Sequence, residues 1–267
     1  MKKIIFTDLD GTLLNYDYSF DAAIPVLEVL KEKKIPIIFC TAKTFAENEY
    51  YQKKMKIKDP FIVENGGAIF IPKNYFSFSF ECKKKNNYFI IELGETYEKL
   101  RNCLEKIRKQ TGFKITGFGD MTIKEVAQDT HLSLYLANLA KKKHYNESFI
   151  FNEPKEKEQI LSEKITDMGF ALTHGGRYFN IHSKNSDKGK AVKILSGLFK
   201  KKYGKIKTIG IGDSANDVPM LNQVDFPAIV QNKKKQWIDT DIPNIYKEKT
   251  QATKAWGKII KKLLNIA

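Results

Sequence analysis

Cysteine and long apolar runs are both scarce in this chain of 267 residues. The three cysteines, Cys40, Cys82 and Cys103, form neither a CxxC pair nor an even-numbered framework. This pattern favours reduced thiols in a cytoplasmic protein over a disulfide-stapled secreted fold. No apolar run approaches the roughly 20 residues that span a bilayer, and the opening Met-Lys-Lys leads into a strand pattern rather than a signal peptide. We therefore expect no membrane partner.

Acidic residues are also in short supply. The sequence has 46 Lys and Arg against 31 Asp and Glu, which gives a formal net charge of +15, and nearly all the excess is lysine. A field of this sign attracts nucleic acid, membrane surfaces or phosphorylated metabolites. A lysine-rich surface can equally reflect the composition of a genome, and the sequence leaves both interpretations open. The hydrophobic fraction of 42% suffices for packed cores, and the length suits two domains or one domain with a large insertion.

The first fourteen residues carry the strongest functional signal. An apolar run at residues 4–6 is typical of a buried parallel strand, and it ends at Asp8-Leu-Asp-Gly-Thr12. Ligands of open α/β sheets collect beyond the carboxyl ends of the strands. Asp8 can serve there as a nucleophile if a metal and positive charge keep it ionised. Asp10 can carry a proton, because neighbouring carboxylates separate their titrations. Taken alone, the motif is also compatible with an Asp-Gly turn that simply ends a strand.

Further polar motifs follow the other predicted strands. Thr41 comes after a strand at residues 35–40, either as a phosphate-binding hydroxyl or as a helix N-cap. Glu64 and Asn65 follow the short strand at residues 61–63, at the same predicted sheet edge. Lys188 opens an amphipathic helix, and the strand at residues 207–211 runs into the acidic segment Gly-Asp-Ser-Ala-Asn-Asp at residues 212–217.

The order of elements predicts an α/β fold with an insertion. Strand, helix and strand alternate at the start of the chain, which implies right-handed parallel crossovers and a Rossmann-like, doubly wound parallel sheet. From about residue 84 the pattern changes to strands mixed with helices and hairpins, which is typical of an α+β unit. We expect a core formed by residues 1–83 and 187–267, and an inserted α+β cap formed by residues 84–186.

Together, the four motifs at Asp8, Thr41, Lys188 and 212–217 resemble those of the haloacid dehalogenase superfamily, which consists mostly of magnesium-dependent phosphatases. The resemblance implies that Asp8 attacks phosphorus and that Asp10 handles the proton. Thr41 would donate a hydrogen bond to the transferring phosphoryl group. Lys188 would supply the fixed positive charge that stabilises both the nucleophile and the transition state.

The same resemblance implies a Mg²⁺ cofactor, because an aspartate that attacks a phosphate dianion needs a hard cation between the two charges. The implied ligands are Asp8, the backbone carbonyl of Asp10 and Asp213. Asp217 would orient a water molecule or Lys188. A turn-rich or calcium-like acidic loop is the alternative interpretation of residues 212–217 taken alone.

The place of the insertion resembles the large type-2 cap of the Cof-like phosphatases. Residues 41–44, 64–67, 119–127 and 174–178 are similar to those of mannosyl-3-phosphoglycerate phosphatases. This similarity implies hydrolysis of mannosyl-3-phosphoglycerate to mannosylglycerate and phosphate. A substrate that carries a carboxylate and a phosphate suits nearby basic groups. The expected substrate-binding residues are Lys43, Glu64, Asn65, Arg177 and Asn216.

One stretch departs from that family. Residues 143–149 read Lys-His-Tyr-Asn-Glu-Ser-Phe, where the family usually has Arg-Glu-Tyr-Asp/Glu-Glu-Pro-Phe. The alternative is therefore a Cof-like sugar-phosphate phosphatase of broader specificity. A more distant alternative is a non-catalytic, basic nucleic-acid-binding protein, for which the sequence shows no recognisable module. We expect a small phosphorylated sugar or glycerate as the partner and no nucleic acid, and the oligomeric state is not predicted.

Overall fold

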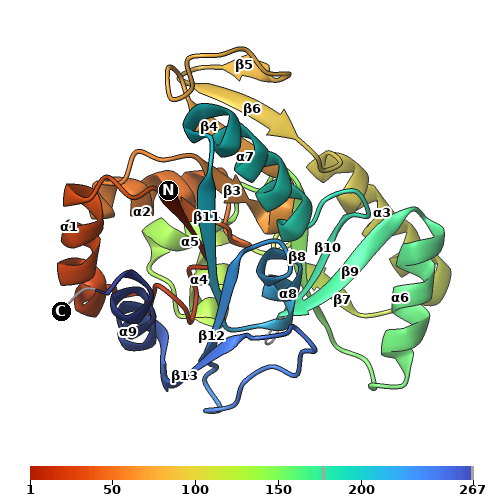
Figure 1. Ribbon diagram of the computed structural model, residues 1–267. Coiled ribbons are helices and arrows are strands. Elements are labelled where there is room, and N and C mark those ends of the chain that lie inside the picture. The colour runs from red at the N-terminus through yellow and green to blue at the C-terminus, as the bar shows by residue number, and fades with distance from the viewer. Residues whose placement is uncertain (176–177, 266–267) are drawn as a thin grey trace.

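The computed structural model describes residues 1–175 and 178–265 and is built around a five-stranded parallel sheet (Figure 1). The strand order is β13-β12-β11-β1-β2, and every neighbouring pair is parallel. Its strands are β1 (Lys2–Thr7), β2 (Ile37–Phe39), β11 (Ile206–Gly212), β12 (Phe226–Gln231) and β13 (Tyr246–Gln251). The long central strands β1 and β11 pair over six residue pairs, from Lys2–Ile206 to Thr7–Ile211.

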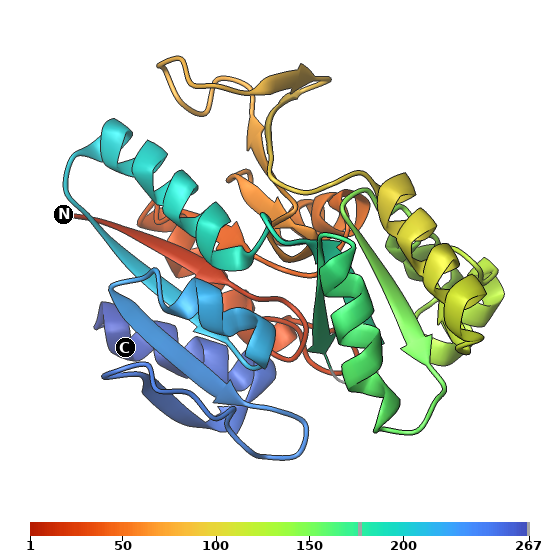
Figure 2. The ribbon, with the colours of Figure 1, turned by 90° about the vertical axis from the view of Figure 1, so that its right-hand side faces the viewer.

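Helices cover both faces of this sheet, because neighbouring residues of each strand point to opposite sides. Ile5 of β1 packs with residues of three helices, α1 (Ile24–Glu32), α2 (Phe45–Met55) and α9 (Ala252–Leu264). Ile4 and Phe6 pack on the other face, with α7 (Lys188–Tyr203) and α8 (Val218–Leu221). Figure 2 shows the parallel strands between α7 on one side and α9 on the other. This is a doubly wound α/β core.

A second sheet extends the core beyond β2. It is antiparallel, with the strand order β3-β4-β6-β5, and β3 adjoins β2 through a bridge between Cys40 and Ile62. Its strands are β3 (Phe61–Val63), β4 (Ala68–Pro72), β5 (Lys83–Lys85) and β6 (Tyr88–Glu92). Because β6 pairs with β4, the predicted boundary between residues 83 and 84 falls inside this sheet.

The cap lies beside the core domain and packs around a hydrophobic cluster of its own. Four antiparallel strands in the order β7-β8-β10-β9 pack against helices α3 and α6 around Leu104, Phe149 and Leu161. Its strands are β7 (Ile115–Gly117), β8 (Asn146–Phe151), β9 (Phe170–Gly175) and β10 (Tyr178–Ser183). Its helices are α3 (Tyr97–Thr111), α4 (Ile123–Thr130), α5 (Leu134–Ala140) and α6 (Lys157–Asp167).

The predicted fold class is confirmed: a doubly wound parallel sheet carries a separate antiparallel-sheet cap. The expected mixture of strands, helices and hairpins is present in the cap, where β9 and β10 pair from Phe170–Ser183 to Gly175–Tyr178. Within the described ranges, none of the helices combines the length and the apolar character that a bilayer crossing requires.

Candidate active site

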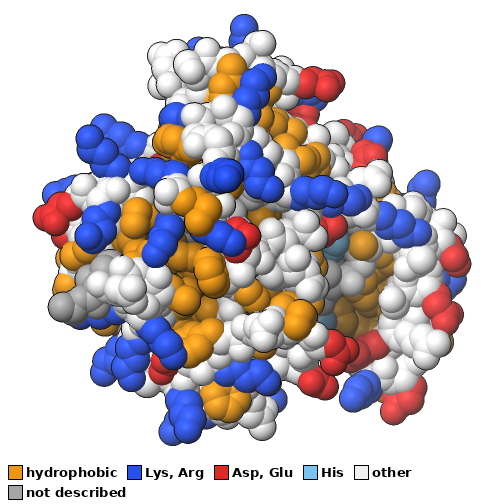
Figure 3. Space-filling model, in the orientation of Figure 1, with side chains coloured by type: hydrophobic (Ala, Val, Ile, Leu, Met, Phe, Trp, Pro, Cys, Tyr) orange, Lys and Arg blue, Asp and Glu red, His pale blue; other side chains and the backbone are white. Residues whose placement is uncertain are grey.

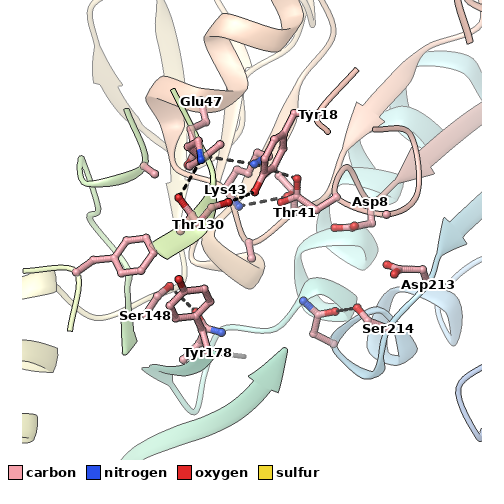
Figure 4. Close-up of a pocket in the computed structure, with 18 of the residues that line it drawn as sticks. Asp8, Tyr18, Thr41, Lys43, Glu47, Thr130, Ser148, Tyr178, Asp213 and Ser214 are labelled. Carbon is pink, nitrogen blue, oxygen red and sulfur yellow. Dashed lines mark hydrogen bonds and ion pairs between the residues drawn. The ribbon is translucent and has the colours of Figure 1, made fainter. Parts of the chain in front are cut away.

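A cavity of about 350 Å³ lies where the carboxyl ends of the parallel strands face the cap. Figure 4 shows Asp8, Thr41 and Asp213 on the core side, and Ser148 and Tyr178 on the cap side. Of the site residues expected from the sequence, six line this cavity, namely Asp8, Asp10, Thr41, Lys43, Asp213 and Asn216, whereas Glu64 and Asn65, expected at the same sheet edge, do not.

Asp8 follows β1 directly and is 5% exposed. Lys188, the first residue of α7, extends to it, and its Nζ lies 2.7 Å from Asp8 Oδ1 and 2.7 Å from Asp217 Oδ1. This lysine is only 1% exposed, so its charge is compensated by the two carboxylates rather than by water. Burial alone would lower the pKa of Lys188, but Asp217 and Asp8 raise it above its ordinary value. Lys188 is therefore a fixed cation beside Asp8.

Asp213 and Asp217 lie in the loop that follows β11. Asp217 Oδ2 accepts hydrogen bonds from the backbone N–H groups of Asp213 and Ser214, at 3.0 and 3.1 Å, and from the Ser214 hydroxyl. Because Asp217 Oδ1 accepts from Lys188 Nζ, both carboxylate oxygens of Asp217 accept hydrogen bonds. Gly11 faces this loop with φ +74°, and a Cβ there would lie 2.7 Å from Asp213 Oδ2. Only glycine accommodates both the left-handed backbone and this close approach.

Three buried carboxylates, of Asp8, Asp213 and Asp217, offer oxygen atoms that lie within 4.8 Å of one another. Burial raises the pKa of Asp8 to about 7, Lys188 opposes that shift, and Asp217 adds to it. Burial and the neighbouring Asp217 and Asp8 likewise raise the pKa of Asp213. Three carboxylates and a single lysine leave a deficit of positive charge. A divalent cation that takes oxygen ligands fits this donor set.

Thr41 is 1% exposed and follows β2, where it lines the cavity. Its hydroxyl accepts a hydrogen bond from the backbone N–H of Lys43 at 3.2 Å. The alternative role of helix N-cap belongs instead to Thr44, which accepts from Glu47 N and forms a capping box at the start of α2. The N-cap interpretation of Thr41 is therefore wrong, and its hydroxyl proton remains available to a ligand in the cavity.

Lys43 lines the core side of the cavity and forms an ion pair with Asp10. Its Nζ lies 3.0 Å from Asp10 Oδ1 and 3.3 Å from Glu47 Oε1, and 5.1 Å from the ring centroid of Tyr18. Burial alone would lower the pKa of Lys43, but Asp10 and Glu47 raise it well above its ordinary value. The carboxylate of Asp10 is half exposed toward the cavity. The ion pair therefore fixes the position of Asp10 while leaving it accessible.

The other predicted substrate-binding residues lie in different places. Glu64 is fully buried, is not among the residues that line the cavity, and accepts the backbone N–H groups of residues 144, 145 and 146 at 2.8 to 3.0 Å. Asn65 lies behind Asn216, whose Nδ2 donates to Asn65 Oδ1 at 3.1 Å. Both contacts hold loops in place. Arg177 lies outside the described residues.

Several residues that line the cavity are absent from the sequence-based prediction. Lys143 and Ser148 belong to the stretch 143–149, so its departure from the family pattern was the available signal. Asn180 is a polar residue buried in an apolar strand of the cap, and it accepts from the Ser148 hydroxyl at 2.7 Å. Tyr18 carries no sequence signal, because its place depends on a contact between its hydroxyl and Thr130 O of the cap.

Named relatives align with almost the whole chain. A glucosyl-3-phosphoglycerate/mannosyl-3-phosphoglycerate phosphatase of Persephonella marina is 44% identical over 264 residues, which cover 98% of this chain and 97% of the relative. A relative with the same description from Methanococcoides burtonii is 50% identical, covering 86% and 85%. A mannosyl-3-phosphoglycerate phosphatase of Pyrococcus furiosus is 40% identical, covering 86% and 91%.

Solved structures match the fold. A Thermoplasma acidophilum protein superimposes with a TM-score of 0.68 at 19% identity, over 100% of both chains. A haloacid dehalogenase subclass IIB sugar phosphatase gives a TM-score of 0.66 at 16% identity, again over 100% of both. A model of the haloacid dehalogenase-like hydrolases matches residues 5–240. With the predicted motifs gathered at one sheet edge, this chain belongs to the haloacid dehalogenase-like hydrolase family.

Proposed function

We propose that this protein is a magnesium-dependent phosphatase that hydrolyses mannosyl-3-phosphoglycerate through an aspartyl-phosphate intermediate. The single observation that carries the proposal is the buried pair of Asp8 and Lys188, 2.7 Å apart, beside Asp213 at the base of the cavity. The choice of substrate is supported by relatives that are 40 to 50% identical and carry that name. Two of these names also include the glucosyl compound.

Residues of the acidic cluster would hold the cofactor. Asp8, the backbone carbonyl of Asp10 and Asp213 are the proposed Mg²⁺ ligands, and Asp217 supports them through Lys188 and the backbone of the 213–214 loop. When bound, the cation screens the charge repulsion between the nucleophile and the phosphate. Because burial raises the pKa of Asp8 to about 7, a nearby cation also favours the ionised carboxylate that the reaction requires.

The chain's own residues would then perform two displacements. An Asp8 oxygen attacks phosphorus, the bond from phosphorus to the ester oxygen breaks, and the leaving alkoxide takes a proton from Asp10. Asp10 next removes a proton from water, which attacks phosphorus and breaks the bond to Asp8, so that phosphate leaves. Thr41 donates to a phosphoryl oxygen, and Lys188 offsets the charge that develops in both steps.

The cap would close over this chemistry and select the substrate. Thr44 Oγ1 donates to Leu139 O at 3.0 Å, and Tyr18 Oη donates to Thr130 O at 3.3 Å, so core and cap are in direct contact at the cavity. A covered site limits the access of bulk water to the aspartyl-phosphate. We propose a core of residues 1–83 and 187–267 and a specificity-determining cap of residues 84–186, joined where β6 of the second segment pairs with β4 of the first, acting in the cytoplasm on a small phosphorylated substrate.

The first test is phosphate release with Mg²⁺ from mannosyl-3-phosphoglycerate, glucosyl-3-phosphoglycerate, 3-phosphoglycerate and common hexose phosphates. Asp8→Asn keeps the size of the side chain and removes the nucleophile, so turnover is expected to fall by at least about 10³-fold. Chelation with EDTA is expected to abolish release, and Mg²⁺ to restore it. The control Glu163→Gln changes an exposed acid of the cap. Activity that survives Asp8→Asn would refute the mechanism.

A second candidate, a sugar-phosphate phosphatase of broader specificity, is favoured by the position of Ser148. It lines the cavity and belongs to the stretch that departs from the mannosyl-3-phosphoglycerate phosphatase pattern, in which proline stands at this place. The same panel separates the candidates. A kcat/KM for the mannosyl compound well above that for hexose phosphates supports the first candidate, and similar values across the panel support the second.

A further inference from the structure

Three lysine side chains are buried in the described part of the chain, and all three lie in or beside the cavity. Lys43 and Lys143 line it, at 6% and 9% exposure, and Lys188, at 1%, contacts Asp8. Lys43 and Lys188 each contact two carboxylates, at distances of 2.7 to 3.3 Å. Their charges are therefore compensated within the protein.

Lys143 is different. Its Nζ donates to Asn146 Oδ1 at 2.9 Å and lies 5.4 Å from the ring centroid of Phe118. Across residues 1–175 and 178–265, no carboxylate lies at ion-pair distance from it. The nearby acid is Glu64, whose oxygens accept three backbone N–H groups from residues 144–146; its charge interacts with Lys143 from beyond ion-pair distance.

Burying the ammonium group of Lys143 in these surroundings costs free energy. A neutral amide, an aromatic ring and a carboxylate beyond ion-pair distance stabilise it only partly, and a buried charge without a counter-charge in direct contact is unfavourable. Because Lys143 faces the cavity, a ligand can supply the missing negative charge. A sugar hydroxyl would form a hydrogen bond but leave the charge uncompensated. An anionic group of the ligand would accept the hydrogen bond and also compensate the charge.

We propose that Lys143 binds a carboxylate of the substrate while the phosphate monoester of the same molecule lies at Asp8. The inference rests on the proposed function and adds a specificity-determining residue that comes from the cap. Phosphate is assigned to the core side, since Asp8, Thr41 and Lys188 gather there. The segment that carries Lys143 joins α5 to β8, whose Ser148 lies across the cavity from Asp8 in Figure 4.

This arrangement defines a substrate class. The ligand is a phosphorylated hydroxy acid, free or glycosylated, with its phosphate toward the core and its carboxylate toward the cap. Asn146 acts as a positioning residue, because its side-chain oxygen fixes Nζ at 2.9 Å and it is itself fully buried. Hexose phosphates lack the second anion and would leave Lys143 unpaired.

The test compares mannosyl-3-phosphoglycerate with its carboxamide, which has the same shape without the charge. Wild-type kcat/KM is expected to favour the carboxylate by about tenfold or more, the range of a charge-assisted hydrogen bond. Lys143→Met is expected to reduce that preference by the same factor, mainly through KM. Lys143→Arg keeps the charge and is expected to retain most of the preference. An unchanged preference in Lys143→Met would overturn the proposal.

Two controls separate this inference from the proposed function. Lys142→Met removes the charge of an exposed neighbour and is expected to leave the preference as in wild type. Calorimetry measures the binding affinities of the two ligands and so gives the preference without turnover. If wild type binds the carboxylate form more tightly, Lys143→Met loses that preference, and neither ligand is hydrolysed, the proposed function fails and the role of Lys143 stands. If wild type hydrolyses both equally, the function stands and the role of Lys143 is refuted.

Discussion

Asp217 shows how much a single side chain organises at this site. One of its oxygens accepts from Lys188, and the other accepts from two backbone N–H groups and a hydroxyl of the 213–214 loop. In Asp217→Asn, one side-chain oxygen can still accept hydrogen bonds, and the new NH₂ group faces the donors that the other oxygen had accepted from. Because groups that hydrogen-bond to the surroundings of a metal site orient the metal ligands, the Mg²⁺ concentration for half-maximal activity is expected to rise about 10- to 100-fold.

A matched control for Asp217→Asn is available at Asp225. Asp225 also accepts from a backbone N–H and a hydroxyl, both of Thr208, at 2.7 and 2.9 Å, but it does not line the cavity. Asp225→Asn is expected to leave the Mg²⁺ requirement unchanged. Titration of activity with MgCl₂ measures both variants, and equal shifts in the two would contradict the role of Asp217.

His182 of β10 is a buried base that links stability to pH. Burial lowers its pKa from the ordinary value near 6.5, although hydrogen bonds to Ser183 and Ser186 oppose the shift. Below about pH 6.5 the unfolded chain therefore binds a proton that the folded chain does not, and the free energy of unfolding decreases as pH falls toward the folded pKa. Above that range the contribution to the slope disappears.

The expected result for His182→Gln is a flatter pH dependence of stability between about pH 7 and 5. Urea unfolding without metal, at intervals of half a pH unit, measures it. His144, whose pKa is also lowered by burial and by Lys85, would retain a slope of the same sign. His131→Asn, at an exposed position with φ 59°, is the control. A slope as steep as that of wild type in His182→Gln would show that His182 is not the source.

For single residues, the sequence predicts the position of a site side chain well where that residue directly follows a predicted strand. Asp8, Asp10, Thr41 and Asp213 follow strands of one parallel sheet, so their meeting at its edge could be predicted. The place of Glu64 could not, because its partners are backbone N–H groups about 80 residues away in the cap. The same holds for Lys143, whose burial depends on how the cap sits over the core.

At the scale of elements, two helices begin with the same capping box but differ in burial, since Thr44 is buried and Thr122 exposed, and in the further contacts of the threonine hydroxyl. Thr44 opens α2 and Thr122 opens α4, and each accepts from the backbone N–H three residues on, at 3.2 Å. Thr44 also donates to Leu139 O of the cap at 3.0 Å. Replacing either by Ala loses the cap, about 1 kcal/mol. Thr44→Ala additionally loses the bond to Leu139, about 0.5 to 1.5 kcal/mol.

We therefore expect Thr44→Ala to lower the free energy of unfolding by more than Thr122→Ala. Urea denaturation of both variants measures the difference, with equal m-values as the check that only stability has changed. Thr44→Ser, which keeps the hydroxyl, is expected to retain both contacts. Equal losses in the two alanine variants would show that the contact between Thr44 and the cap contributes nothing to stability.

The elements that could be predicted are those with strong apolar patterns. β1, β11 and β12 carry buried runs, and α3 places Leu100, Leu104 and Ile107 on one buried face. β13 was not predicted, because its sequence Tyr-Lys-Glu-Lys-Thr-Gln has no apolar run. It lies at the edge of the sheet, where charged side chains are tolerated and discourage pairing with another chain. Its strand state depends on pairing with β12, which local propensity does not show.

For the molecule as a whole, the open question from the sequence is whether the net charge of +15 has a role. Figure 3 shows Lys and Arg side chains scattered in separate groups across the visible face. Two of the three buried lysines beside the cavity, Lys43 and Lys188, are paired with carboxylates, so a net positive field at the cavity would come from Lys143 and the surface lysines. A field of this kind raises the local concentration of an anionic substrate and is screened by salt.

The functional interpretation of this charge makes a measurable prediction. Raising NaCl from about 20 mM to about 300 mM shortens the Debye length from roughly 20 Å to roughly 6 Å. We expect kcat/KM to fall several-fold through KM, while kcat stays constant, because the bound substrate is close to its partners and weakly screened. The fall is expected to be steeper for mannosyl-3-phosphoglycerate than for its carboxamide, which carries one negative charge fewer. Equal, flat profiles for both would leave the excess of lysine as a feature of composition alone, since charge that does not act on the substrate cannot make its binding depend on salt.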